Sequence, residues 1–136
     1  MLTVPVEIKK SPIHGYGVFA SEPIHQDAVV WMFHPGLDQR MTKFALKFAE
    51  PRVREFVLKR GYINPKSPEE YVICIDEAQF MNFPPTDKSA NLKLGGLQDK
   101  EQMLLAAVDI LAGEELTVPP QSDADYARKM QGYGPG

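Results

Sequence analysis

Cysteine is nearly absent from the sequence, because Cys74 is the single cysteine among 136 residues. One cysteine excludes an intramolecular disulfide and a zinc site built from cysteines, and we expect no metal site. Cys74 lies in the apolar run YVICI. A cysteine in such a run is more typical of a small core residue than of a nucleophile.

Long apolar runs are also missing. Nothing approaches the roughly 18 consecutive apolar residues that a membrane-spanning helix needs, and the opening MLTVPVEIKK lacks the apolar core of a secretory signal. Lysine and arginine form no dense cluster, and the formal net charge is −3. We therefore expect a cytoplasmic protein whose partners are neither membranes nor nucleic acids.

Turn-forming residues, in contrast, are plentiful. The 12 prolines and 10 glycines are spread along the whole chain, which favours many turns and short strands over a helical bundle. With 43% hydrophobic residues, a chain of this length can build one core. We expect a mainly β single domain over residues 1–120 with a small helical insert at about 38–70, followed by a C-terminal tail at 121–136.

The N-terminal region combines a strand pattern with two glycines. Residues 2–8 alternate apolar and polar side chains, as a half-buried strand does, and Pro5 places that strand at a sheet edge. Gly15 and Gly17 then flank Tyr16, and glycines permit a positive φ and a close approach of the backbone. For a lone Gly-x-Gly a hairpin turn is the better explanation. The dinucleotide-binding fingerprint is excluded, because it needs a strand before the glycines and a helix after them, and here a turn precedes a strand.

A second apolar run, AVVWMF at residues 28–33, is typical of a central strand. His34 and Pro35 end it. A histidine at a strand end could titrate in a site, although a lone histidine there is more often structural.

The hydrophobic period changes between residues 38 and 60. There we predict a short amphipathic helix before Pro51 and a second helix from Pro51 to Gly61, with basic residues on the solvated face. The inward positions are then Met41, Phe44, Ala45 and Phe48 in the first helix and Val53, Phe56 and Val57 in the second. Residues 62–70 have the composition of a loop.

The stretch QFMNFPPTDKSAN at residues 79–91 predicts a strand that ends in a loop pinned by two prolines. Asn82 lies there among large apolar neighbours. A buried amide without a hydrogen-bonding partner costs about 1–3 kcal/mol, so Asn82 needs a partner. Capping a turn in the core would supply one, and so would a ligand.

Two further strands are predicted around this stretch. Residues 71–75 form an apolar run, and residues 103–110, MLLAAVDI, suit a strand in this context although their composition would also allow a helix. Between them, Gly95 and Gly96 indicate a hairpin or bulge.

Taken in order, three segments resemble the SET-domain family of protein-lysine methyltransferases. HGYGVFAS at 14–21 is similar to the family's opening Gly-x-Gly strand. ICIDEAQFMNF at 73–83 is similar to its aspartate-containing strand and asparagine motif, and AVDILAGEELTV at 107–118 to its closing segment. The helices predicted in between occupy the place of the family's variable insert.

The resemblance implies a β-clip-like fold of several short curved sheets, with a knot-like C-terminal segment. Residues 113–118 would then lie beside Asn82. It also implies S-adenosylmethionine as the cofactor, bound on one side of the domain, and a lysine-containing protein as the substrate. The substrate lysine would enter by a narrow channel from the opposite side. The mild negative charge would suit a basic substrate only weakly.

Carried over residue by residue, the resemblance also implies a cofactor site. The backbone at Gly15, Tyr16 and Gly17 would contact the methionine part of the cofactor, and Asn82 would bind its amino group. Phe83, which stands where the family carries histidine, would face the adenine.

The positions of the family's channel tyrosines depart from its pattern. By the resemblance they fall on His34, Leu94 and Pro120, none of which has a phenolic hydroxyl. Tyr126 in the tail is the candidate catalytic replacement, with Tyr133 as a second possibility. These departures leave two functions open: a methyltransferase, or a degenerate module that binds a cofactor or a protein. A third and weaker alternative is an unrelated small β domain, which would bind no cofactor.

Overall fold

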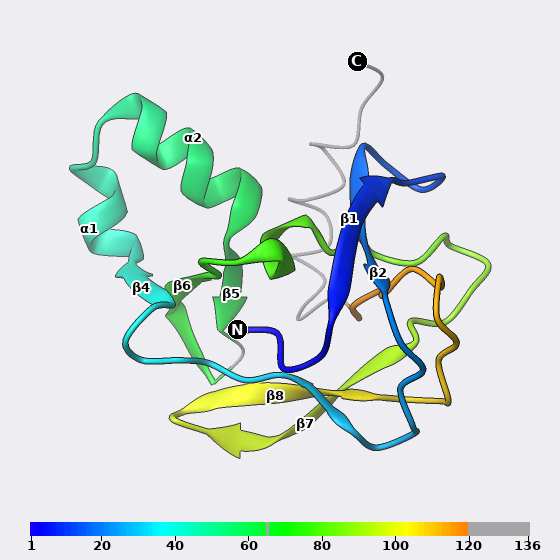
Figure 1. Cartoon of the computed structure of the whole chain (residues 1–136). Coiled ribbons are helices and arrows are strands. Elements are labelled where there is room, and N and C mark those ends of the chain that lie inside the picture. Colours follow the sequence, from blue (N-terminus) through cyan, green and yellow to red (C-terminus); the bar gives the residue numbers. More distant parts are fainter. Residues whose placement is uncertain (65, 120–136) are drawn as a thin grey trace.

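Three small antiparallel sheets form the framework of the computed structural model, which describes residues 1–64 and 66–119 (Figure 1). The first sheet pairs β1 (Val6–Lys10) with β2 (Tyr16–Ala20). The second has the order β3 (Val29–Trp31), β8 (Glu101–Ala106), β7 (Leu92–Gln98). The third has the order β4 (Gln39–Thr42), β6 (Ser67–Ile73), β5 (Tyr62–Asn64).

The N-terminal strand is confirmed, in a shorter form than predicted. It begins after Pro5, and because its sheet has two strands it is an edge strand. Leu2 instead bridges to Trp31 of β3, so the first residues join a different sheet. The proline separates the two pairings because it has no N–H to donate.

In the second sheet β8 pairs with β3 on one side and with β7 on the other. The far side of β3 pairs with the first residues of the chain, through the Leu2–Trp31 bridge and the bond from the Thr3 N–H to the Val30 carbonyl at 2.8 Å, so the predicted central position of this strand is confirmed. Of the run at residues 103–110, which was predicted to be a strand although its composition also allowed a helix, residues 103–106 lie in β8 and residues 107–110 follow it outside the strand. β8 carries Leu104 and Ala106 into the core, which explains why its composition resembles that of a buried helix.

The predicted helices are present, and both predicted inward faces are wrong in part, since Val53 and Phe56 of the second helix are 38% and 42% exposed. α1 (Lys43–Lys47) is capped by Thr42, whose hydroxyl accepts a 3.0 Å bond from the Ala45 N–H. α2 (Pro51–Arg60) begins at Pro51 and is followed by Gly61, as predicted. Phe44 and Phe48, however, are largely exposed.

The buried contacts of the helices come from fewer side chains than the period indicated. Leu46 of α1 and Val57 of α2 form a small cluster with Tyr71 of β6. α1 is a single short turn, so one side chain anchors it, and the i, i+4 stripe that includes Phe44 and Phe48 faces away. The insert is also shorter than predicted, because residues 62–70 are mostly strand.

Residues 62–70 were predicted to be a loop from their composition, and the structure instead places β5 and the start of β6 there. Pro68 lies near the beginning of β6, next to the point where the β5–β6 register shifts between Ile63 and Asn64. Proline is tolerated at a strand end or an irregularity, so its presence did not exclude a strand.

A short 3-10 helix, η1 (Glu77–Phe80), replaces the strand predicted from residue 79. Asp76 caps it, since its carboxylate accepts a 3.1 Å bond from the Ala78 N–H. Asn82 lies two residues after its end and pairs with Thr117 as an isolated parallel bridge. In the described parts of the chain, no helix has the length and apolarity that crossing a membrane requires.

Candidate functional site

The Gly-x-Gly loop is organised by Ser11. The Ser11 hydroxyl accepts bonds from the N–H groups of Ile13 (2.9 Å) and His14 (3.3 Å), and the Ser11 N–H donates to the Gly15 carbonyl at 2.7 Å. Gly15 has φ +48°, a conformation that favours glycine. The loop is therefore a tight, internally bonded turn that leads into β2.

Gly17 allows a side chain to approach the β2 backbone. A Cβ added at Gly17 would lie 2.3 Å from Oε2 of Glu115. The Glu115 carboxylate is held in that place by the Ser11 hydroxyl, which donates to its two oxygens at 2.7 and 2.9 Å. Both properties expected of the two glycines, a positive φ and a close approach, are thus present.

The Asn82 amide lies at the centre of this arrangement and is 3% exposed. Its Nδ2 is near four oxygens: Ser11 Oγ (3.2 Å), the His14 carbonyl (3.1 Å), the Tyr16 carbonyl (3.3 Å) and Glu115 Oε2 (2.8 Å). An amide nitrogen carries two hydrogens, so these acceptors share them. The hydrogen-bonding partners that the buried Asn82 amide needs are therefore supplied by the chain itself.

The C-terminal segment 114–118 lies between β2 and the loops that carry the two asparagines. On one side Leu116 N–H donates to the Val18 carbonyl at 2.7 Å, and on the other Val118 N–H donates to the Asn82 carbonyl at 3.1 Å. Asn91 clamps the same segment, with Nδ2 donating to the Glu115 carbonyl at 2.8 Å. The expected proximity of residues 113–118 to Asn82 is confirmed.

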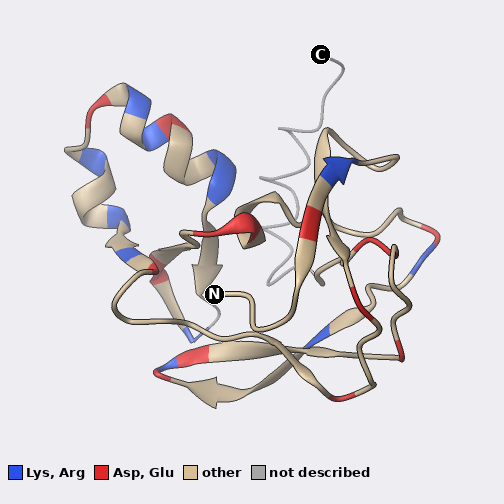
Figure 2. Cartoon of the chain, viewed as in Figure 1, with Lys and Arg blue, Asp and Glu red and all other residues tan. Residues whose placement is uncertain are grey.

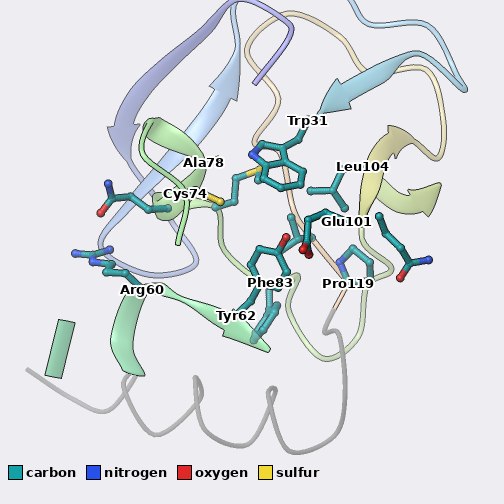
Figure 3. Close-up of a pocket in the computed structure, with 13 residues that line it drawn as sticks. Trp31, Arg60, Tyr62, Cys74, Ala78, Phe83, Glu101, Leu104 and Pro119 are labelled. Carbon is teal, nitrogen blue, oxygen red and sulfur yellow. The ribbon is translucent and has the colours of Figure 1, made fainter. Parts of the chain in front are cut away.

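A pocket of about 50 Å³ opens next to this junction (Figure 3). At about 10–15 Å³ for each water, it could hold about three to five water molecules or a group of similar size. Its polar lining comes mostly from positions that the sequence did not single out, namely Trp31, Arg60, Tyr62, Gln79, Glu101 and Gln102. Met81, Phe83 and Val118 belong to its apolar lining.

Glu101 is the most deeply buried charged group of this pocket, at 1% exposure. Its Oε2 accepts bonds from Arg40 Nε at 2.8 Å and from Asn64 Nδ2 at 2.9 Å. Burial raises the pKa of Glu101 above its ordinary value, and the bond to Arg40 opposes the rise without cancelling it. The pocket wall therefore contains a carboxyl group that is harder to ionise than an exposed one.

Tyr62 supplies a phenol to the same wall. Burial, followed by the nearby Cys74 thiol and Glu101 carboxyl, raises the pKa of Tyr62, so its hydroxyl keeps its proton. Its ring meets the Trp31 indole edge to face, with centroids 6.2 Å apart. Among the described residues, Trp31 Nε1 is a buried donor that has no hydrogen-bond acceptor.

The predicted site residues fall into two groups. Gly15, Gly17 and Asn82 meet at the junction with Glu115, and the neighbouring Tyr16 is 60% exposed. Phe83 is buried and lines the pocket.

Two residues predicted for the lysine channel, His34 and Leu94, do not line this pocket. His34 is exposed, and its Nδ1 accepts a 3.2 Å bond from the Gly36 N–H. Leu94 lies in β7 against the main core. Pro120 and the two tail tyrosines, Tyr126 and Tyr133, lie outside the described residues.

Comparison with known proteins identifies the fold. No family model and no curated protein matches the sequence. Among solved structures, a candidate histone methyltransferase from Plasmodium falciparum superposes with a TM-score of 0.57 at 14% identity, covering 85% of this chain and 92% of that one.

Two structures of polycomb repressive complex 2 give similar results. The Chaetomium thermophilum complex matches with a TM-score of 0.62 at 19% identity over 88% of this chain, and a ctPRC2 complex with H3K27me3 and H3K27M matches with 0.59 at 19% over 84%. This chain spans only about one seventh of those chains, 15% and 14%. The chain has the SET-domain fold, as its three motifs predicted.

Proposed function

We propose that this protein is an S-adenosylmethionine-dependent protein-lysine methyltransferase. One observation carries the proposal: Asn82 bonds to the Gly-x-Gly loop, while its neighbours Met81 and Phe83 line the pocket. A single three-residue stretch therefore separates the expected cofactor side from a small pocket. Such an arrangement suits a transfer in which two molecules react across a narrow gap.

The junction around Asn82 has the chemistry to hold the amino group of the cofactor. It collects oxygen acceptors, namely the His14 and Tyr16 carbonyls and the Glu115 carboxylate. An ammonium has three donors and a positive charge, so acceptors of this kind suit it. The cofactor, when bound, supplies a methyl group on a positively charged sulfur.

The pocket has the chemistry to receive the end of a lysine side chain. Its apolar wall, with Met81, Phe83 and Val118, suits the methylene stem, and Tyr62 and Glu101 provide polar groups for the amine. Enclosure keeps water from competing for the reacting groups. In this proposal the Tyr62 hydroxyl takes the role for which the family's channel tyrosines are missing at His34 and Pro120.

Methyl transfer from isotopically labelled cofactor to a panel of lysine-rich proteins tests the proposal. We expect transfer by the wild type and a loss of at least about tenfold, or roughly 1.4 kcal/mol, in Tyr62→Phe. Tyr126→Phe, run in parallel, tests the tail tyrosine for the same role. A folded wild type that binds the cofactor and methylates nothing in the panel would contradict the proposed enzyme.

A second function, a degenerate module that binds a cofactor or a protein without turnover, is favoured by one observation. The buried Asn82 amide already has acceptors within the chain, so the junction is complete without a ligand. Cofactor affinity without turnover would support this function. The cytoplasmic location stays a prediction.

A further inference from the structure

The helical hairpin of residues 43–60 differs in charge from the rest of the protein. It contains six lysines and arginines and two glutamates, a formal charge of +4. The whole chain has −3, so the remaining residues together carry −7. Figure 2 shows this separation, with blue positions repeated along α1 and α2. The hairpin is therefore a basic element on an acidic protein.

The same hairpin exposes large apolar side chains. Phe44 and Phe48 are 71% and 76% exposed, and their rings meet edge to face with centroids 5.2 Å apart. Val53, Phe56 and Leu58 of α2 are each about 40% exposed. Single exposed apolar residues are normal, whereas a group of them within 15 residues of chain indicates an interaction surface.

Folding of the hairpin does not account for this exposure. Leu46 and Val57 anchor the helices to Tyr71, and the Thr42 cap and Pro51 fix where they begin. None of these contacts uses the rings of Phe44 and Phe48. As far as residues 1–64 and 66–119 are concerned, the two rings thus remain available for a further contact.

We propose that this basic hairpin, residues 43–60, docks an acidic helical segment of a partner protein that carries leucine-like side chains. Lys43 and Lys47 are one turn apart, and Phe44 and Phe48 form a second row beside them. A partner helix with carboxylates and aliphatic side chains at the same i, i+4 spacing would pair with both rows. Charge complementarity selects such a helix, and burial of the rings supplies the affinity.

Two other occupants fit less well. A nucleic acid would meet Glu50 and Glu55 on the same hairpin, and Glu55 already pairs with Arg52 at 3.3 Å. An anionic membrane surface would be repelled by the same two glutamates, and the hairpin lacks tryptophan, which such surfaces often engage. Binding to a nucleic acid and binding to a membrane are both measured in the test below.

The test measures binding of a fluorescently labelled acidic peptide by anisotropy, near physiological ionic strength. The peptide is an amphipathic helix of about 18 residues, or five turns, with glutamate on one face and leucine on the other. We expect saturable binding that weakens as salt is added. Because no cofactor is present, the result is independent of the proposed enzyme activity.

Two double variants locate the binding surface. Phe44→Ser with Phe48→Ser removes the rings, and Lys47→Glu with Arg54→Glu brings the formal charge of the hairpin from +4 to zero. Each should weaken binding at least about tenfold. The matched controls, Leu97→Ser with Leu111→Ser and Lys88→Glu with Lys100→Glu, change exposed apolar and basic residues elsewhere and should leave binding unchanged.

Three results would overturn the proposal. The first is no saturable binding of the peptide, and the second is equal weakening in a hairpin variant and its control. The third is binding to duplex DNA or to vesicles of phosphatidylcholine and phosphatidylserine with none to the peptide. Circular dichroism checks that each variant is folded. Loss of binding by a folded variant is then due to the changed surface and not to unfolding.

Discussion

Replacing Asn82 by alanine should destabilise the protein strongly. The substitution removes two amide hydrogens that serve oxygens of Ser11, His14, Tyr16 and Glu115. One of these bonds goes to a carboxylate, and such bonds contribute about 1.5–3 kcal/mol against about 0.5–1.5 for neutral ones. Together they predict a loss of about 2–4 kcal/mol in the free energy of unfolding.

Chemical denaturation and thermal melting measure this loss. For a chain of this size, about 2–4 kcal/mol corresponds to a fall in Tm of roughly 6–16 °C. Gln98→Ala, at an exposed position of β7, is the control and should change the free energy of unfolding by less than about 0.5 kcal/mol. An Asn82→Ala variant as stable as this control would refute the argument that the junction depends on the amide.

Other substitutions probe the glycine loop, the pocket and the hairpin. Gly17→Ala should cost about 1–3 kcal/mol in urea unfolding, because its Cβ would lie 2.3 Å from Glu115 Oε2, whereas a Cβ at Gly96 would lie 4.0 Å from its nearest neighbour, the Met103 Cε, and Gly96→Ala is the control. Glu101 has a raised pKa, so its stabilising contribution is full below its ordinary value of 4.5 and is lost as pH rises through the raised pKa. Unfolding at several pH values should therefore show the wild type losing stability relative to Glu101→Gln as pH increases, and an unchanged difference would contradict the shift. Phe44→Ser with Phe48→Ser should change the free energy of unfolding by less than about 1 kcal/mol, since both rings are exposed, and a larger loss would mean that they pack in the core.

The three motifs were predictable because each combines local chemistry with its order along the chain. Gly15 and Gly17 mark a positive φ and a close approach, which depend on the residue itself. Asn82 among apolar neighbours required a buried partner. The sequence alone did not show that Glu115, 33 residues later, provides it.

The pocket was not predictable from local patterns. Glu101 follows the polar turn at Asp99 and Lys100, where a charged residue normally points to solvent. It is buried because Arg40 and Asn64, distant in sequence, bond to its carboxylate. Such partners become visible only when the sheets are assembled.

The helical insert shows the limit of periodicity. The spacing of Phe44 and Phe48 is that of a core-facing stripe, yet Leu46 makes the buried contact. In a helix of five residues the backbone direction is fixed by its ends, so the sequence pattern does not decide which side faces the core. An apolar stripe of this kind can equally be an outward binding surface.

Calorimetric titration with S-adenosylmethionine tests the central claim, that the oxygens around Asn82 hold the amino group of the cofactor. We expect micromolar binding by the wild type, weakened about tenfold or more in Glu115→Gln, which removes the charge and keeps the shape. Glu114→Gln, at the exposed neighbouring position, should bind as the wild type does. No binding at millimolar cofactor, or equal binding by Glu115→Gln and the wild type, would contradict the claim.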